Sequence, residues 1–201
     1  MREEDGGDES CRGVRPGRAK REGMVLRKTI GALAIVSIIS VPARAQAPPD
    51  PGPAIAAVKQ VAFLEGNWSG EGWIQMGPGP REEFAQVETV ELKVDGSILQ
   101  IEGIGYSKGE NPEKVHHALA LIAFDPIGNN LVFSSFVAGR PRLDVVAEVM
   151  GNSFTWGFSP PGGGQIRYSL QVEDGTWHEV GEYSADGESW FQFFEMHLTK
   201  Q

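Results

Sequence analysis

The stretch QIRYSLQVEDGTWHEVGEYSADGESWFQFFEMHLTK, residues 165–200, contains three β-strand patterns separated by two turn signals. Asp174-Gly175 and Asp186-Gly187 are Asp-Gly pairs, which favour the tight turns of β-hairpins. Apolar and aromatic residues flank both pairs. Connections this short make strands that are neighbours in sequence pair in space. The stretch therefore predicts an antiparallel meander.

The same pattern extends back from this stretch to Gly66. Short segments rich in β-branched and aromatic residues are interrupted about every ten residues by turn signals, a spacing typical of an all-β sandwich or barrel. Because a closed sheet has no exposed edges, we predict an all-β fold, a single up-and-down antiparallel barrel of about ten strands. The strands are expected at 67–76, 83–94, 97–106, 115–124, 131–138, 143–150, 153–159, 165–172, 176–184 and 189–200.

Alternation within these strands indicates which side chains face inward. In the last strand, one face is expected to carry Trp190, Phe194, Met196 and Leu198. In the sixth, Val145, Ala147 and Val149 share a face. Upstream of the barrel, the apolar residues of 55–64 recur at helical spacing and predict a short helix, and the Pro-rich residues 46–54 predict a linker. The barrel domain is therefore expected over 55–201.

The segment 24–45 has the organisation of a secretory signal peptide. Arg27 and Lys28 supply positive charge, and residues 29–41 form an uncharged, mostly apolar run. That run is shorter than the roughly 20 residues that span a membrane. Pro42 and two overlapping cleavage motifs follow, and we expect cleavage after Ala45 rather than after Ala47. A retained anchor or a buried helix are the alternatives.

The signal predicts a periplasmic or secreted protein. Residues 1–23 are charged and Gly-rich, so we expect them to be disordered, or to be a mis-annotated extension upstream of a start at Met24. The one cysteine, Cys11, precedes the signal, so the mature chain can form no disulfide. Residues 46–201 hold 9 Lys and Arg against 21 Asp and Glu, a net charge of 9 − 21 = −12. This charge argues against nucleic acid and anionic membrane surfaces as partners.

Gly66-Asn67-Trp68 follows the predicted helix and opens the first strand. Here the chain resembles the calycin superfamily, whose lipocalins carry a G-x-W motif at this place. The longer run 63–72 and the closing run 181–200 are similar to the lipocalin-like DUF1579 proteins of unknown function, over roughly residues 60–201. The resemblance implies a structural role for Gly66 and Trp68, with Lys200 as a cation–π partner of the indole.

The opening also looks like that of nitrobindin-type barrels, which hold haem through one histidine near the C-terminal strands. The resemblance implies His197 as the candidate ligand. However, His197 alternates with Met196 and Leu198 and should point outward if these fill the interior. Haem is therefore disfavoured. A zinc site also has weak support, because the sequence has no i, i+2 His pair and no Cys cluster.

Polar residues interrupt the apolar face of the second strand. Phe84, Val90, Leu92 and Val94 share this face with Gln86 and Glu88. A barrel with polar groups on its inner face can hold a ligand or water, whereas the alternative places these groups in solvent. The candidate ligand-binding residues combine such polar groups with aromatic ones: Trp73, Gln86, Glu88, His117, Phe136, Trp156 and Tyr168.

Three functions remain open from the sequence. The first is the binding of a small apolar or amphipathic molecule inside the barrel. The second is an isomerase or hydrolase that uses Glu88, Glu102 or His117 as an acid or base; no G-x-S-x-G motif is present. The third is a solid barrel that acts as a protein-interaction module.

Overall fold

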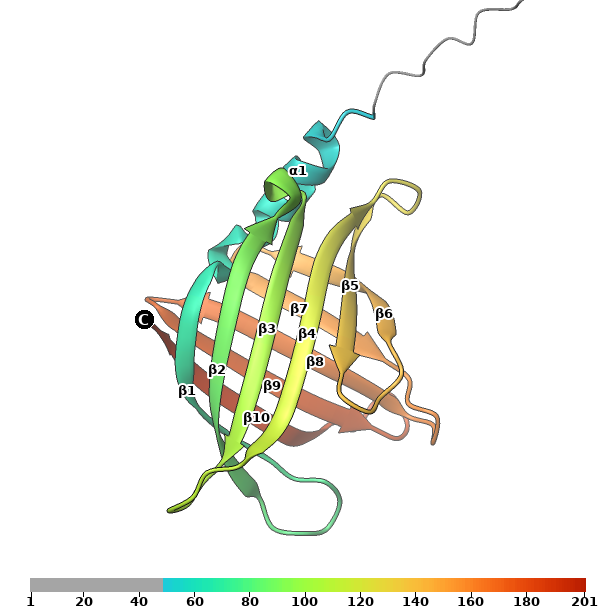
Figure 1. Ribbon diagram of the computed structural model, residues 1–201. Helices are drawn as coiled ribbons and strands as arrows, with labels where there is room; N and C mark the ends of the chain where they lie inside the picture. Colours follow the sequence, from blue (N-terminus) through green and yellow to red (C-terminus); the bar gives the residue numbers. More distant parts are fainter. Residues whose placement is uncertain (1–48) are drawn as a thin grey trace, which may run out of the picture. The chain divides into compact units, whose positions relative to one another are not determined.

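The computed structural model of the chain describes residues 49–201 (Figure 1). The predicted extension 1–23 and the predicted signal peptide 24–45 lie outside the described residues. The helical segment comprises α1 (Gly52–Val58) and the 3₁₀ helix η1 (Lys59–Leu64), so it begins three residues earlier than predicted. Proline in its first turn accounts for the early start, because the fixed φ of proline suits that position.

The all-β barrel predicted from the sequence is confirmed. Ten antiparallel strands close on themselves in the order β1-β10-β9-β8-β7-β6-β5-β4-β3-β2. A short 3₁₀ turn, η2 (Val94–Gly96), links two of them. The strands are β1 (Gly66–Ile74), β2 (Glu82–Lys93), β3 (Ile98–Ser107), β4 (Lys114–Asp125), β5 (Asn130–Val137), β6 (Leu143–Met150), β7 (Ser153–Phe158), β8 (Gln165–Glu173), β9 (Thr176–Ser184) and β10 (Phe191–Lys200).

Tight turns set the register of neighbouring strands. Asp174 and Gly175 have φ values of 48° and 75°, the left-handed conformation that a type I′ hairpin turn requires. They join β8 to β9 with Glu173 opposite Thr176. At the seam of the barrel, β1 pairs with β10, and Trp68 lies opposite Lys200. The barrel therefore has no free edge among the described strands.

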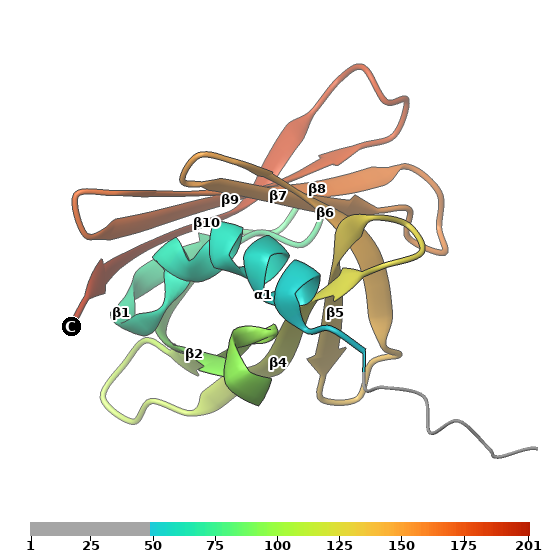
Figure 2. The same cartoon turned by 90° about the horizontal axis from the view of Figure 1, so that it is seen from above.

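The helical segment lies across one end of the barrel, as Figure 2 shows from above. Val58, Val61 and Leu64 are fully buried there. Trp68, also fully buried, donates its indole N–H to the carbonyl oxygen of Leu64 at 2.8 Å. This hydrogen bond joins the helical segment to the first strand. The buried side chains of the helical segment cover this end of the core.

The prediction that Trp190 shares the inward face of the last strand is wrong. The register of β10 against β9 shifts between Gln192 and Phe194, because a β-bulge interrupts the alternation. Phe194, Met196 and Leu198 belong to the core, whereas Trp190 precedes β10 and lies under the guanidinium of Arg167, 3.9 Å from its ring centroid.

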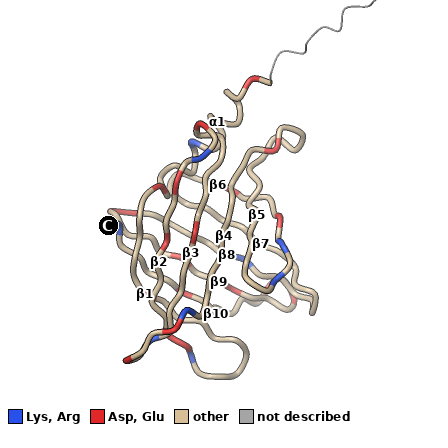
Figure 3. The backbone as a smooth tube through the Cα atoms, in the orientation of Figure 1, with Lys and Arg blue, Asp and Glu red and all other residues tan. Residues whose placement is uncertain are grey.

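Among the described residues, no helix is long and apolar enough to cross a membrane. Acidic residues are spread over most of the strands, and Lys and Arg are sparse (Figure 3). The 27 Asp and Glu of the chain outnumber its 18 Lys and Arg. The wall of the barrel therefore presents mainly negative charge to solvent.

Candidate functional site

Two polar side chains of β2 occupy the inside of the barrel. Gln86 and Glu88 are only 5% and 8% exposed, and they share the face of the buried Phe84 and Val90. Their register partners on β3 are glycines: Gly105 lies opposite Gln86, and Gly103 opposite Glu88. Each glycine leaves the space that the longer polar side chain fills.

Glu88 is a buried carboxyl group that lacks a full set of partners. Gln86 donates its Nε2 proton to Glu88 Oε1 at 2.7 Å, but Glu88 Oε2 is buried without a hydrogen-bond partner. Burial, together with the nearby charge of Glu179, raises the pKa of Glu88 to about 8. A buried polar atom without a partner is costly and uncommon in native proteins. Glu88 is therefore the strongest functional candidate in the barrel.

Glu179, on β9, is a second interior carboxyl group, and the sequence analysis did not single it out. It lies opposite Leu170 on β8 and Met196 on β10, both buried in the core. Trp177 donates its indole N–H to Glu179 Oε2 at 3.1 Å, while burial raises the pKa of Glu179 to about 7. The sequence did offer one sign that Glu179 faces the interior: it lies two residues after Trp177 and therefore on the same face of the strand.

Aromatic rings line the interior beside these carboxyl groups. Trp156 stacks on Tyr168 with a centroid distance of 4.3 Å and on Phe133 with 4.7 Å. The ring of Phe194 meets Tyr168 edge-on at 5.7 Å. Burial raises the pKa of Tyr168, and the charge of Glu179 adds to this effect. We define the interior belt as five residues: Gln86, Glu88, Trp156, Tyr168 and Glu179.

Part of the interior belt is accessible to solvent. Glu179, Tyr168 and Trp156 point inside the barrel wall, yet each is only half-buried, so part of its surface can be reached by a water-sized molecule. At the end away from the helix, His116 faces Gly105 and is exposed. Although its surface reaches solvent, the protein around the His116 ring partly desolvates it, and this desolvation, with the charges of Arg140 and His117, lowers its pKa.

The other three predicted ligand-binding residues lie on the outer wall. Trp73 donates its indole N–H to Glu195 Oε2 at 3.1 Å, and Phe136 is 38% exposed. The His117 ring lies 3.0 Å from Glu102 Oε1, and both side chains are more than 40% exposed. The sequence could not separate these residues from the interior ones, because strand alternation shows two faces without showing which is inside.

The three residues predicted to have a structural role, Gly66, Trp68 and Lys200, lie in contact. The ammonium of Lys200 lies 5.2 Å from the Trp68 ring centroid, within cation–π range. Gly66 has a φ of 133°, and a side-chain carbon there would come within 2.7 Å of the Lys200 stem. Glycine at this position therefore allows the lysine to pass over the indole.

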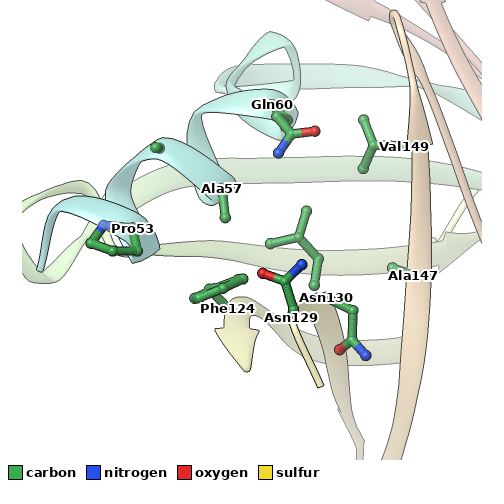
Figure 4. A pocket seen from close by; sticks show the side chains of 10 residues that line it. Pro53, Ala57, Gln60, Phe124, Asn129, Asn130, Ala147 and Val149 are labelled. Atoms are coloured by element: carbon green, nitrogen blue, oxygen red, sulfur yellow. The ribbon is translucent and has the colours of Figure 1, made fainter. Parts of the chain in front are cut away.

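A separate pocket of about 410 Å³ lies beneath α1, between the helix and strands β4 to β6 (Figure 4). Its walls combine apolar side chains, Phe124, Leu131, Ala147 and Val149, with polar ones, and its volume is in the range of small-molecule sites. Asn130, which also lines it, donates to the Gly128 carbonyl oxygen at 3.3 Å. Asn130 Oδ1 is buried without a partner beside the pocket.

The proposed haem ligand does not fit a haem inside the barrel. His197 lies on the outer wall, with its side chain 57% exposed. Its ring stacks on that of His178, with 4.2 Å between centroids. The expectation that His197 points outward is therefore confirmed.

Comparison with known proteins supports the fold. No family model matches the chain, and no curated protein matches it, so the similarity to DUF1579 stays a prediction. The structure of Rv2717c from M. tuberculosis is similar, with a TM-score of 0.54 at 12% identity over 74% of this chain and 98% of that one. The structure of a DUF3598 protein of unknown function from Nostoc punctiforme also matches, at 7% identity over 72% of this chain and 99% of that one, with a TM-score of 0.21. The chain thus has a barrel fold similar to that of Rv2717c.

Proposed function

We propose that the barrel binds a small amphipathic molecule in the interior belt. The single observation that carries the proposal is that Glu88 Oε2 is buried without a hydrogen-bond partner. Gly103, opposite Glu88 on β3, leaves room for the glutamate side chain. A ligand group that meets this oxygen would offset the cost of burying it. The aromatic rings of Trp156 and Tyr168 would cover the apolar part of the ligand.

We infer that the polar end of the ligand is basic. Two carboxyl groups, Glu88 and Glu179, face the interior; burial raises the pKa of Glu88, and the charge of Glu179 adds to this effect. A cation would favour the ionised form of Glu88. An anion of the same size would face two acidic groups and no basic partner within the belt.

Calorimetric titration with two matched probes tests this proposal. Phenethylamine and 3-phenylpropionate carry the same ring and opposite charges. We expect phenethylamine to bind and 3-phenylpropionate to bind at least tenfold more weakly. Glu88→Gln should weaken the amine at least tenfold, whereas Glu102→Gln on the outer wall should leave its affinity unchanged. Equal affinity for both probes, or no effect of Glu88→Gln, would remove the basic-ligand proposal.

The pocket beneath α1 supports a second location for a ligand. Its apolar side chains and the unpartnered Asn130 Oδ1 beside it suit a neutral molecule with one hydrogen-bond donor. Ala147 is 7% exposed and lines the pocket, so Ala147→Phe would fill it. Loss of phenethylamine binding in Ala147→Phe, with binding retained in Glu88→Gln, would place the ligand in this pocket instead.

A further inference from the structure

The outer wall near the barrel seam carries a second cluster of chemically active side chains. His178 on β9 and His197 on β10 are register partners, so their side chains project from the same face of the wall. Glu195 lies two residues before His197 and shares this face. The three side chains are 43%, 57% and 28% exposed, respectively. They are therefore open to solvent and distinct from the interior belt.

Two of the three distances between the ligand atoms of this cluster are close to those that a metal ion requires. Glu195 Oε1 lies 3.1 Å from His178 Nε2 and 3.3 Å from His197 Nε2. One ligand atom from each residue lies within 4.8 Å of the others. A tetrahedral zinc with bonds of about 2.0–2.1 Å separates its ligand atoms by about 3.3–3.4 Å. Two of the three separations are thus close to those of a bound site before any metal enters.

The carboxylate is also held in place by a second layer of contacts. Trp73 on β1 donates its indole N–H to Glu195 Oε2 at 3.1 Å, which leaves Oε1 to face the histidines. The Trp73 ring is in turn covered by the Arg81 guanidinium, 3.5 Å from its centroid. Partners of this kind orient metal-ligating carboxylates in known sites and strengthen metal binding. The arrangement holds Glu195 in a fixed orientation.

We propose that His178, Glu195 and His197 bind a divalent transition metal of the zinc class. Two imidazole nitrogens and one carboxylate oxygen form a donor set that suits zinc, and the exposed position leaves a fourth ligand to solvent. The ligands come from two strands held by backbone pairing, so the site exists only in the folded barrel. Zinc should therefore stabilise the fold by mass action. The linear spacing of the histidines did not predict this site.

Metal titration of the full chain, expressed without an affinity tag and freed of metal, tests the site. We expect one Zn²⁺ per chain by calorimetry, an increased thermal unfolding midpoint, and the visible absorption bands of tetrahedral Co²⁺ when cobalt replaces zinc. Each of the variants His178→Gln and His197→Gln should lower Zn²⁺ affinity at least tenfold and abolish the cobalt bands. His117→Gln, which alters another outer-wall histidine, should change neither.

The alternative is a hydrogen-bonded trio that never binds metal. Absence of the cobalt bands from the unaltered chain, or Zn²⁺ affinity unchanged in the double variant His178→Gln/His197→Gln, would overturn the proposal. The altered side chains are exposed, so the metal-free variants should unfold at the temperature of the metal-free parent. Trp73→Phe removes the hydrogen bond to Glu195 and should weaken Zn²⁺ by a smaller factor than loss of either histidine.

Discussion

The carboxylate of Glu88 lies against the backbone of Gly103, its register partner on the neighbouring strand. A side-chain carbon at Gly103 would come within 2.5 Å of Glu88 Oε1, and one at Gly105 within 2.8 Å of Gln86 Oε1. Glycine weakens a strand interior unless close approach requires it. The interior belt therefore depends on the glycines of β3 as much as on the polar residues of β2.

Gly103→Ala should destabilise the barrel by about 1–3 kcal/mol, because the added methyl group overpacks the space that Glu88 fills. The free energy of unfolding from urea titration measures this cost. In the double variant with Glu88→Ala, the alanine at position 103 should cost much less, because the clashing carboxylate is gone. Strictly additive effects of the two substitutions would contradict the proposed contact.

Stability should fall as the pH rises toward 8. The pKa of Glu88 is about 8 in the folded barrel, against an ordinary value of 4.5. Between these pH values the folded state binds more protons than the unfolded state, so the free energy of unfolding decreases with pH, and the loss is complete above about 8. Glu88→Gln should reduce this slope, of which Glu179 with its pKa of about 7 retains a part, and should stabilise the protein at pH 8 by a few kcal/mol. Urea titrations from pH 5 to 9 measure it, and Glu102→Gln should retain the parental slope.

Trp68→Phe should destabilise the fold by about 2–4 kcal/mol. The substitution leaves the Leu64 carbonyl oxygen without its indole donor and leaves a gap in a fully buried site. Lys200→Met, which retains an unbranched stem over the indole, should cost about 0.5–1 kcal/mol through loss of the cation–π contact. If the two variants unfolded at equal denaturant concentrations, the indole hydrogen bond would not be the main anchor of the helical segment.

Export is a separate prediction, carried by the sequence of residues 24–45 alone. Expression from Met24 in a Gram-negative host should yield a periplasmic chain that begins near Gln46, because small residues precede the cleavage position after Ala45. Intact-mass measurement of the periplasmic fraction tests this. An intact cytoplasmic chain that still carries residues 24–45 would contradict it.

The architecture could be predicted because local signals specify it. Asp174-Gly175 and similar turns fix which strands pair, and alternation fixes which side chains share a face. The bulge at Gln192 and Phe194 could not be predicted, since no local pattern distinguishes it. His178 lies opposite His197 because of the register between β9 and β10, and that register shifts at the irregularity between Gln192 and Phe194.

The interior belt was predicted only in part for a related reason. Gln86 and Glu88 interrupt an apolar face, and this interruption is visible in the sequence. Glu179 belongs to a strand with polar residues on both faces, so alternation alone could not assign it to the interior. His117 and Phe136 lie outside because the core faces of β4 and β5 carry Ala120, Ile122 and Phe133 instead.

The central claim is that Glu88 is a buried, ligand-responsive carboxyl group. Carbon-13 NMR of the protein labelled at its glutamate carboxyl carbons, titrated from pH 4 to 10, tests this most directly. We expect one resonance, absent from Glu88→Gln, that titrates near pH 8 and shifts to a lower pKa when phenethylamine is saturating. A Glu88 resonance that titrates below pH 5, or whose pKa is unchanged by the amine, would contradict the account.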